Sequence, residues 1–351
     1  MTTAIADPLD SLVQLSRALG QETRLVQPGG GNTSIKQGDA LLVKGSGTDL
    51  RSINRDGFTR LSLARLAALA AADAMSDADM MRFMASCMLA EGPAPSVETP
   101  LHSLLPHHVI AHTHDVATMS LTNVPDATAE RLVHELFEGT IVYVPYVRPG
   151  FPLAKSVGAM VGRIPPGAIG LTLAHHGLVV WGDDAEQVHE RLVHVVGKIE
   201  KYIAVCREGK RRSAVGSVGR SKVAAPALAP TARRRLAELV LPAVRGALGV
   251  PDRVILHYDD ADDILATLAE EGTPELVSRG MATPEHLLRA GRLPVWLELD
   301  FSAPPDTIVA QVRTRLAAAR DEYEEYHRRN ASPGEAPLAD WAKVVLARDW
   351  A

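Results

Sequence analysis

Cysteine is scarce in this chain of 351 residues, which contains only Cys87 and Cys206. Two cysteines so far apart cannot form a disulfide scaffold or a cysteine-rich zinc module, and their scarcity is typical of a reducing compartment. An excess of positive charge is also absent, because the formal net charge is −5. This charge argues against a protein that binds nucleic acid through a basic surface, and we predict no nucleic-acid partner.

Long apolar segments are missing as well. The sequence has no window of about 18 apolar residues, which a membrane-spanning helix would need. Its start, MTTAIADPLD, has neither the basic residues nor the apolar stretch of a secretory signal. We therefore expect a cytoplasmic protein with no membrane partner. With 46% hydrophobic and 23% charged residues, the composition is that of a globular protein of about two domains.

Hydrophobic patterns divide the chain into two regions joined by a segment of different composition. Asp183 and Glu186 resemble a capping box that opens a helix reaching about residue 208. After it, basic residues, serine, glycine and proline dominate, which indicates a solvated linker. We predict a first domain over 1–208, a linker over 209–230, a small α/β region over 231–330 and a loosely held tail over 331–351.

Histidines gather at the ends of two predicted strands. His112 and His114 lie two residues apart in HVIAHTH, which alternates like a strand, so both imidazoles point to one face. A second stretch of strand character runs into His175 and His176, which point to opposite faces, so one of them can complete a set of three imidazoles. Three imidazoles with an open position are typical of a catalytic divalent metal, most often zinc. The alternative is that these histidines fill polar gaps between strands and bond to backbone carbonyls.

Glu98 stands near the predicted start of a helix, in PSVETPLH. Its carboxylate could simply offset the helix dipole, or it could lie beside the metal as a general base. His102 follows one helical turn later. We interpret His102 as a helix-face partner of Glu98 rather than as a metal ligand.

Two loops of small residues lie near predicted strand ends: GGGNTS (29–34) and KGSGT (44–48). The first does not open a helix, and no Gly-Lys-Ser/Thr tail follows, so it is neither a dinucleotide fingerprint nor a phosphate-binding P-loop. Neighbouring loops of this kind could still cradle a phosphate or carboxylate. The alternative is that both are ordinary turns.

Taken in order, five segments resemble the class II aldolase/adducin family: GGGNTSIK (29–36), VKGSGTDL (43–50), PSVETPLH (95–102), HVIAHTHD (108–115) and LAHHGLVVWG (173–182). The likeness covers roughly residues 10–208. The whole chain is similar to the aldolase half of bifunctional rhamnulose-1-phosphate aldolase/alcohol dehydrogenase proteins. The chain has no Gly-x-x-x-Gly-x-Gly dinucleotide loop, so we expect no dehydrogenase activity of it.

The resemblance implies a three-layer αβα fold around a central, mostly antiparallel sheet. It implies a zinc ion, or another divalent metal, bound by His112, His114 and His176. Glu98 matches the catalytic glutamate of the family. The positions that would hold the substrate phosphate are Asn32, Ser46, Gly47 and Ser96.

Two features depart from the family pattern. Family aldolases often have a second serine directly before the glutamate, where this chain has Val97. This weakens the expectation of a phosphate site and leaves that of a metal site intact. The family's catalytic tyrosine has no match here, since no segment selects Tyr143 or Tyr146.

The activity implied by the resemblance is that of a lyase in carbohydrate metabolism. We predict zinc-dependent retro-aldol cleavage of a ketose 1-phosphate, similar to rhamnulose 1-phosphate, to dihydroxyacetone phosphate and an aldehyde. Family members usually form fourfold rings, so we expect a homotetramer. The alternatives are a sugar-phosphate epimerase or dehydratase of the same family, and a metal-free adducin-like binding module.

Overall fold

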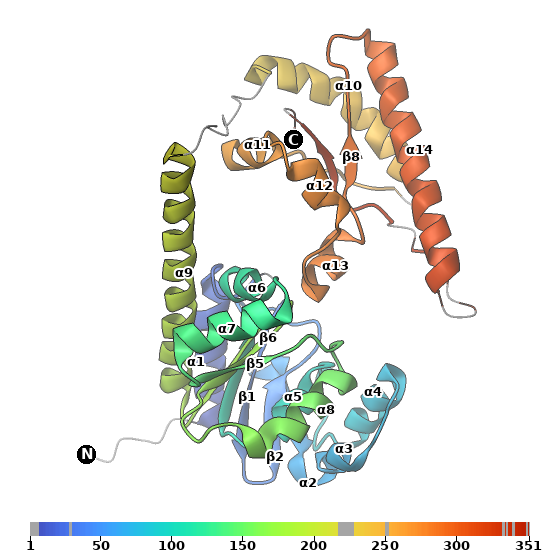
Figure 1. Cartoon of the computed structure of the whole chain (residues 1–351). Coiled ribbons are helices and arrows are strands. Elements are labelled where there is room, and N and C mark those ends of the chain that lie inside the picture. The colour runs from blue at the N-terminus through green and yellow to red at the C-terminus, as the bar shows by residue number, and fades with distance from the viewer. Residues whose placement is uncertain are drawn as a thin grey trace. The chain divides into compact units, whose positions relative to one another are not determined.

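The structure is a computed structural model that describes residues 7–27, 30–216, 228–249, 253–331, 334, 336–338, 341–348 and 350. The chain divides into two compact units, Met1–Arg211 and Arg212–Ala351. Each unit has a hydrophobic core of its own, and the helices and strands are labelled in Figure 1.

The first unit is built on a sheet whose seven described strands lie in the order β3-β2-β1-β4-β7-β6-β5. The strands are β1 (Asn32–Gln37), β2 (Ala40–Lys44), β3 (Phe58–Ser62), β4 (Val109–Thr113), β5 (Ile141–Val144), β6 (Gly170–Leu173) and β7 (Gly177–Gly182). Neighbouring strands are antiparallel, except for the parallel pair of β5 and β6. The prediction of a central, mostly antiparallel sheet is therefore confirmed.

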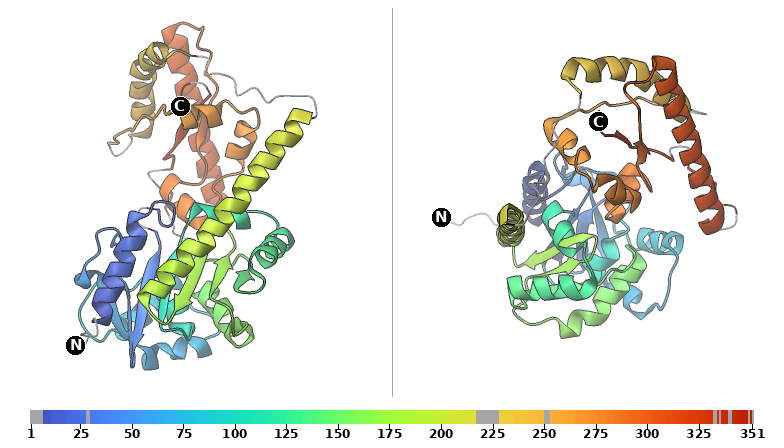
Figure 2. Two further views of the ribbon diagram at one scale, coloured as in Figure 1. Left: turned by 90° about the vertical axis from the view of Figure 1, so that its left-hand side faces the viewer. Right: turned by 45° about the horizontal axis from the view of Figure 1, so that its top comes forward.

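Helices cover both faces of this sheet (Figure 2). Val109 and Ala111 of β4 belong to the core on one face, and Ile110 belongs to the core on the other. This alternation is the two-residue period of a strand that is buried on both sides. The first face is covered by α1 (Pro8–Gln21), α6 (Val116–Thr122), α7 (Asp126–Phe137) and α9 (Ala185–Gly216).

The opposite face is covered in two parts. Next to β4, β6 and β7 lie α5 (Thr99–Leu104) and α8 (Phe151–Met160). Next to β2 and β3 lie α2 (Leu63–Leu66), α3 (Ala68–Ala71) and α4 (Asp77–Ser86). Two short 3-10 helices, η1 (Arg55–Gly57) and η2 (Val161–Arg163), complete the unit. The predicted αβα layering is confirmed.

The second unit combines helices with a two-stranded parallel sheet of β8 (Val295–Leu297) and β9 (Val345–Ala347). Its two long helices, α10 (Pro230–Leu248) and α14 (Pro305–Asn330), pack against each other. Three shorter helices lie between them in the chain: α11 (Asp262–Leu268), α12 (Thr273–Ser278) and α13 (Pro284–Ala290). This agrees with the predicted small C-terminal α/β unit.

The boundaries of the predicted linker and tail differ from the structure. Helix α9 continues to Gly216, into the segment predicted as linker, since arginine, lysine, glutamate and alanine all favour helix without an apolar stripe. Residues 217–227 lie outside the described residues. The prediction of a loosely held tail was wrong where the tail is described, because β9 pairs with β8 and both Trp341 and Trp350 are buried in the core of the second unit.

Candidate metal centre

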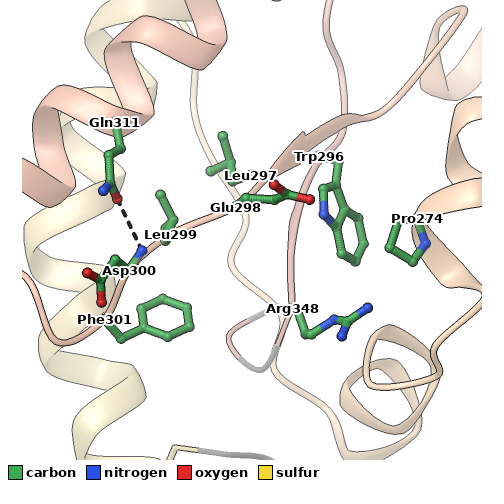
Figure 3. A pocket seen from close by; sticks show the side chains of 9 residues that line it. All are labelled: Pro274, Trp296, Leu297, Glu298, Leu299, Asp300, Phe301, Gln311 and Arg348. Atoms are coloured by element: carbon green, nitrogen blue, oxygen red, sulfur yellow. Dashed lines mark hydrogen bonds between the residues drawn. The ribbon is translucent and has the colours of Figure 1, made fainter.

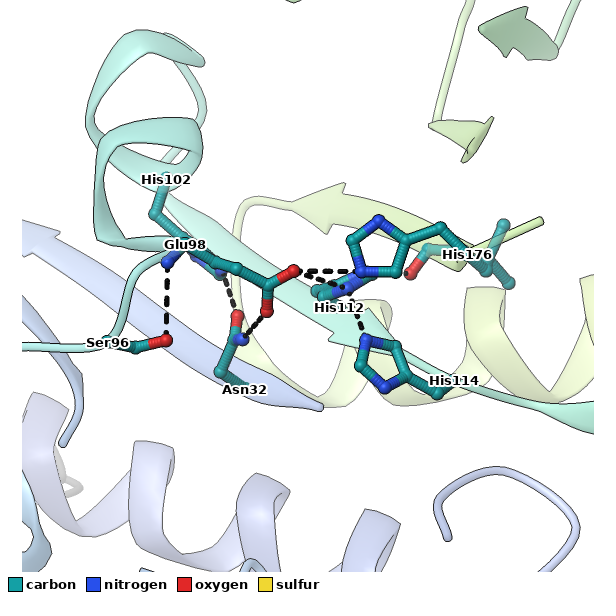
Figure 4. Close-up of polar contacts among 8 residues, drawn as sticks. Asn32, Ser96, Glu98, His102, His112, His114 and His176 are labelled. Atoms are coloured by element: carbon teal, nitrogen blue, oxygen red, sulfur yellow. Dashed lines mark hydrogen bonds and ion pairs between the residues drawn. The ribbon is translucent and has the colours of Figure 1, made fainter. Parts of the chain in front are cut away.

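Four side chains from three parts of the first unit converge at one end of the sheet (Figure 4). His112 belongs to β4, and His114 follows directly after this strand. His176 lies in the turn between β6 and β7, and Glu98 is the residue that precedes the first turn of α5. Their ligand atoms all lie within 4.8 Å of one another. In the part of the chain that the structure describes, no other group of histidine, cysteine, aspartate and glutamate has this geometry.

The contacts within the cluster are short. The Nε2 atoms of His112 and His114 are 2.9 Å apart. One carboxylate oxygen of Glu98, Oε1, lies 2.9 Å from His176 Nε2 and 3.4 Å from His112 Nε2. Three imidazole nitrogens and one carboxylate oxygen therefore face a common point.

Strand pairing brings the histidines together. His112 lies opposite Val179 in the register of β4 with β7, so the turn that precedes β7 comes close to the end of β4. Gly177 is required there, because a Cβ atom at this position would lie 2.1 Å from the carbonyl oxygen of Thr113. Directly after His114, the carboxylate of Asp115 accepts a hydrogen bond from the Thr118 amide and so caps α6.

The structure decides between the two adjacent histidines. His176 joins the cluster, whereas His175 adopts a left-handed backbone with φ of 56°. Histidine is among the residues that tolerate this region better than most. Nδ1 of His175 lies 2.6 Å from Oδ1 of Asn123, outside the cluster. The left-handed residue reverses the chain and so allows His176 to point inward.

The donor set is compatible with a divalent metal. His112 Nδ1 donates a hydrogen bond of 3.0 Å to the carbonyl of Leu178, which fixes the tautomer that leaves Nε2 available as a ligand. All three histidines are buried. Nδ1 of His176 is buried without a hydrogen-bond partner among the described residues. Imidazole nitrogens with one carboxylate suit zinc and other transition metals.

Glu98 is ionised in this environment. Burial by itself raises the pKa of its carboxyl group, but the adjacent His112 and His176 outweigh this and hold that pKa well below its ordinary range. The cluster thus contains one negative charge beside three imidazoles. This charge balance favours a cation at the common point.

A polar network behind Glu98 was not predicted from the sequence. Asn32 Nδ2 donates a hydrogen bond of 2.6 Å to Glu98 Oε2, and Asn32 Oδ1 contacts Nε2 of His102. The other ring nitrogen of His102, Nδ1, lies 2.7 Å from Ser34 Oγ. His102 is outside the metal cluster, as predicted, but its side chain reaches Glu98 through Asn32 rather than directly.

Hydrogen bonds connect residues predicted to hold a phosphate with the segment from Ala94 to Glu98. The Ser46 amide donates to the carbonyl of Ala94 at 2.8 Å, and this places the loop of Ser46 and Gly47 beside the segment that contains Ser96. The Ser96 hydroxyl accepts a hydrogen bond of 3.3 Å from the Glu98 amide. The side chain of Asn32 donates to the carboxylate of Glu98. Its assignment as a phosphate ligand stays a prediction, as do those of the other three.

The two tyrosines considered in the sequence have different surroundings. The hydroxyl of Tyr143 donates to Asp126 at 2.6 Å, and burial together with that carboxylate raises the pKa of the tyrosine. Tyr146 is half exposed, and its ring lies 5.9 Å from that of His175. Of these two tyrosines, Tyr146 is therefore the one whose ring lies next to the turn that contains His175 and His176.

The effect of Lys36 on the pH dependence of stability provides a test of this part of the fold. Its ammonium group donates to the Leu105 carbonyl at the end of α5, and burial lowers the pKa of Lys36 to about 8. The pKa of lysine in an unfolded chain is about 10.4. Between these values the unfolded chain binds more protons, so the free energy of unfolding should rise with pH from about 8 to about 10.

This rise should be smaller in Lys36→Met than in the wild type, as measured by urea unfolding across that pH range. Lys201→Met, which removes an exposed lysine of α9, controls for the loss of one positive charge. Equal pH dependence in the wild type and in Lys36→Met would contradict the prediction.

The second unit contains a separate pocket of about 560 Å³ (Figure 3). Its charged side chains are Glu298, Asp300 and Arg348, and all three are exposed. The Asp300 amide donates to Gln311 at 3.1 Å. The pocket brings together no set of ligands comparable to the histidine cluster.

Comparisons with known proteins bear on this site. The sequence matches the model of the Class II Aldolase and Adducin N-terminal domain over residues 10–203, and that of the Aldolase class II second domain over residues 235–351. A solved N-terminal class II aldolase domain of a conserved protein from Thermoplasma acidophilum is 34% identical, with a TM-score of 0.53 over 58% of this chain and 97% of that one. A sugar-phosphate aldolase from Thermotoga maritima is 15% identical, with a TM-score of 0.44 over 57% and 96%.

A curated relative is longer than this chain. The protein named uncharacterized oxidoreductase YuxG, from Bacillus subtilis (strain 168), is 29% identical over 353 aligned positions, which cover 96% of this chain and 49% of the relative. The chain thus spans about half the length of that relative. None of the helices described in the structure is long and apolar enough to cross a membrane.

The fold and the site define an α/β protein with a buried cluster of three histidines and one glutamate that can hold a divalent metal. The match to the N-terminal domain model extends over more than half of the chain, and the protein belongs to the class II aldolase/adducin family. That family suggests lyase activity, but it also contains epimerases and members that are not enzymes. The particular reaction therefore needs an argument from the site itself.

Proposed function

We propose that the protein is a zinc-dependent class II aldolase that cleaves a ketose 1-phosphate similar to rhamnulose 1-phosphate. The products are dihydroxyacetone phosphate and an aldehyde. The observation that supports this best is the buried group of His112, His114 and His176 with the ionised carboxylate of Glu98 at 2.9 Å from one imidazole. An adducin-like binding module would have no use for such a cluster.

Retro-aldol cleavage breaks the bond between C3 and C4 of the ketose and leaves its electron pair on the fragment that becomes dihydroxyacetone phosphate. A divalent metal, when bound by the three histidines, supplies a Lewis acid that stabilises negative charge on substrate oxygens. The C4 hydroxyl loses one proton, and C3 gains one. Glu98 is the acid–base group of the cluster: its ionised carboxylate would take up the proton that the C4 hydroxyl loses and give it to C3, so that the protons balance. His112 is held in one tautomer by Leu178 and so keeps Nε2 directed at the site.

The phosphate group of the substrate is assigned to the loops in front of Glu98. The hydroxyls of Ser46 and Ser96 and the backbone amide of Gly47 can donate to phosphate oxygens, and φ of 78° at Gly47 turns this loop in a way that glycine allows. Val97 stands where a second serine would add a donor, and this residue is 44% exposed. Binding energy from the phosphate would position the reacting carbons.

The proposal also covers the oligomeric state of the protein and its location in the cell. We infer a homotetramer that binds small-molecule sugar phosphates, by analogy with the family. The low cysteine content supports a cytoplasmic location.

The purified protein of 351 residues, loaded with zinc, should release dihydroxyacetone phosphate from L-rhamnulose 1-phosphate, measured by a coupled assay with glycerol-3-phosphate dehydrogenase. A chelator should abolish the release, and added zinc should restore it, because the metal is the Lewis acid that stabilises negative charge on the cleaved fragment. A panel of ketose 1-phosphates extends the assay to related sugars. Conversion to an epimer without release would identify an epimerase instead. Full zinc occupancy with no reaction on any member of the panel would contradict the aldolase assignment.

A further inference from the structure

The face of β1 that lies toward α5 is polar where an apolar surface would be expected. Asn32, Ser34 and Lys36 alternate along this face, and Ile35 between them belongs to the core on the other side. Asn32 and Ser34 are buried. Each of the three bonds to a different part of the segment from Glu98 to Leu105. Helix α5 is thus attached to β1 through specific polar contacts, and Glu98 stands at its start.

His102 links two of these contacts and is fully buried. Asn32 donates through Nδ2 to Glu98, so its Oδ1 is the atom that faces His102, and this oxygen can only accept. The hydrogen of the neutral His102 ring must therefore be on Nε2. Nδ1 is left as an acceptor for the Ser34 hydroxyl at 2.7 Å. The donors run in one direction, from Ser34 to His102, to Asn32 and to Glu98, with the protons assigned from this network.

The same chain of hydrogen bonds gives the two carboxylate oxygens of Glu98 different partners. Oε2 accepts from Asn32 at 2.6 Å, and Oε1 lies 2.9 Å from His176. If the Asn32 amide were free to flip, its carbonyl would face the Glu98 carboxylate and repel it. The bond from His102 prevents this flip, since it requires the Asn32 oxygen on its own side. Burial lowers the pKa of His102 to about 3, in agreement with a neutral ring at physiological pH.

We propose that His102 is a positioning residue, which acts through Asn32 to hold the Glu98 carboxylate with Oε1 directed at the histidine cluster. This inference rests on the proposed function, in which Glu98 transfers the proton. It also gives the side chain of Asn32 a part in orienting the acid–base group, in addition to its predicted contact with the substrate phosphate. A histidine of α5 that merely filled the space between this helix and β1 would need neither a fixed tautomer nor a partner that bonds to Glu98.

Two variants of His102 separate positioning from packing. His102→Leu keeps most of the side-chain volume and removes both hydrogen bonds, whereas His102→Gln keeps a donor near the position of Nε2. We expect His102→Leu to lower kcat for the ketose 1-phosphate by about a hundredfold with a nearly unchanged KM, because a displaced acid–base group costs about that much. In His102→Gln, kcat should recover to within about tenfold of the wild type. Ser103→Ala changes a residue of the same helix whose hydroxyl donates to the Pro100 carbonyl, and it should leave kcat unchanged.

A structural measurement tests the inference without relying on activity. In a crystal structure of zinc-loaded His102→Leu, the Glu98 carboxylate should have turned so that Oε1 no longer contacts His176, while the zinc and its three histidines stay in place. A carboxylate in its original position would overturn the proposal, even if activity were lost. Equal loss of kcat and of thermal stability in the Leu and Gln variants would also overturn it, since that result indicates packing alone. Failure of the wild type to cleave any ketose 1-phosphate refutes the proposed function, and the crystal structure then still decides whether His102 positions Glu98.

Discussion

Replacing His176 with alanine should abolish tight zinc binding, whereas replacing the adjacent His175 should leave it intact. The two residues are neighbours in the same turn, but only His176 contributes a nitrogen to the cluster. Changes to groups that merely support metal ligands cost about 10–100-fold in affinity. Loss of a ligand itself should therefore weaken binding by at least about a hundredfold. His175 directs its ring toward Asn123 and Tyr146 instead.

The measurement is competition for zinc against a chromophoric chelator, combined with metal analysis after dialysis. His175→Asn is the matched control, because asparagine also tolerates the left-handed backbone with φ of 56° at this position. At a concentration a thousandfold above its Kd, zinc should raise the free energy of unfolding of the wild type and of this control by about 4 kcal/mol. It should not raise the free energy of unfolding of His176→Ala. Equal affinities in all three proteins would contradict the metal centre. Equal losses of zinc affinity in both variants would indicate that zinc binding depends on the conformation of the turn rather than on the His176 imidazole.

The parts of this site that sequence could predict are those set by local periodicity. His112 and His114 share a face because strand side chains alternate, and this holds for any strand in that segment. The choice between His175 and His176 has no such local rule. It depends on the left-handed backbone at His175 and on the close approach of Gly177 to Thr113, which only the paired strands reveal.

The network behind Glu98 was beyond sequence reasoning for a related reason. Asn32 and Glu98 are 66 positions apart, and Ser34 and His102 are 68 apart, so no spacing in the sequence connects them. Helical spacing predicted that His102 lies near Glu98 on the same helix, but it could not predict the contacts of His102 with Ser34 and Asn32 of β1. The tail shows the same limit, since β9 is only three residues long and pairs with a strand far earlier in the chain.

Glu98→Gln should nearly eliminate turnover while the protein still binds zinc through its histidines. Glutamine has the shape of glutamate, and its amide oxygen can still accept the bond from Asn32, so the start of α5 should keep its conformation. Its amide cannot give or take a proton at neutral pH. Loss of a general acid–base group costs about 10²–10⁴ in rate, and we expect kcat to fall by that factor. Zinc affinity should change far less than in His176→Ala, because three imidazole ligands remain.

A partial reaction identifies the step that Glu98 performs. In heavy water the wild type should exchange one hydrogen of dihydroxyacetone phosphate at the carbon that becomes C3, and proton NMR follows this exchange without any aldehyde. Glu98→Gln should lose the exchange. Ser46→Ala, which alters an exposed position of the candidate phosphate loop, should raise KM and keep the exchange at saturating substrate. Undiminished exchange in Glu98→Gln would show that another group transfers the proton. In that case the low pKa of Glu98 reflects only its contacts with His112 and His176, and the carboxylate serves the metal rather than the substrate.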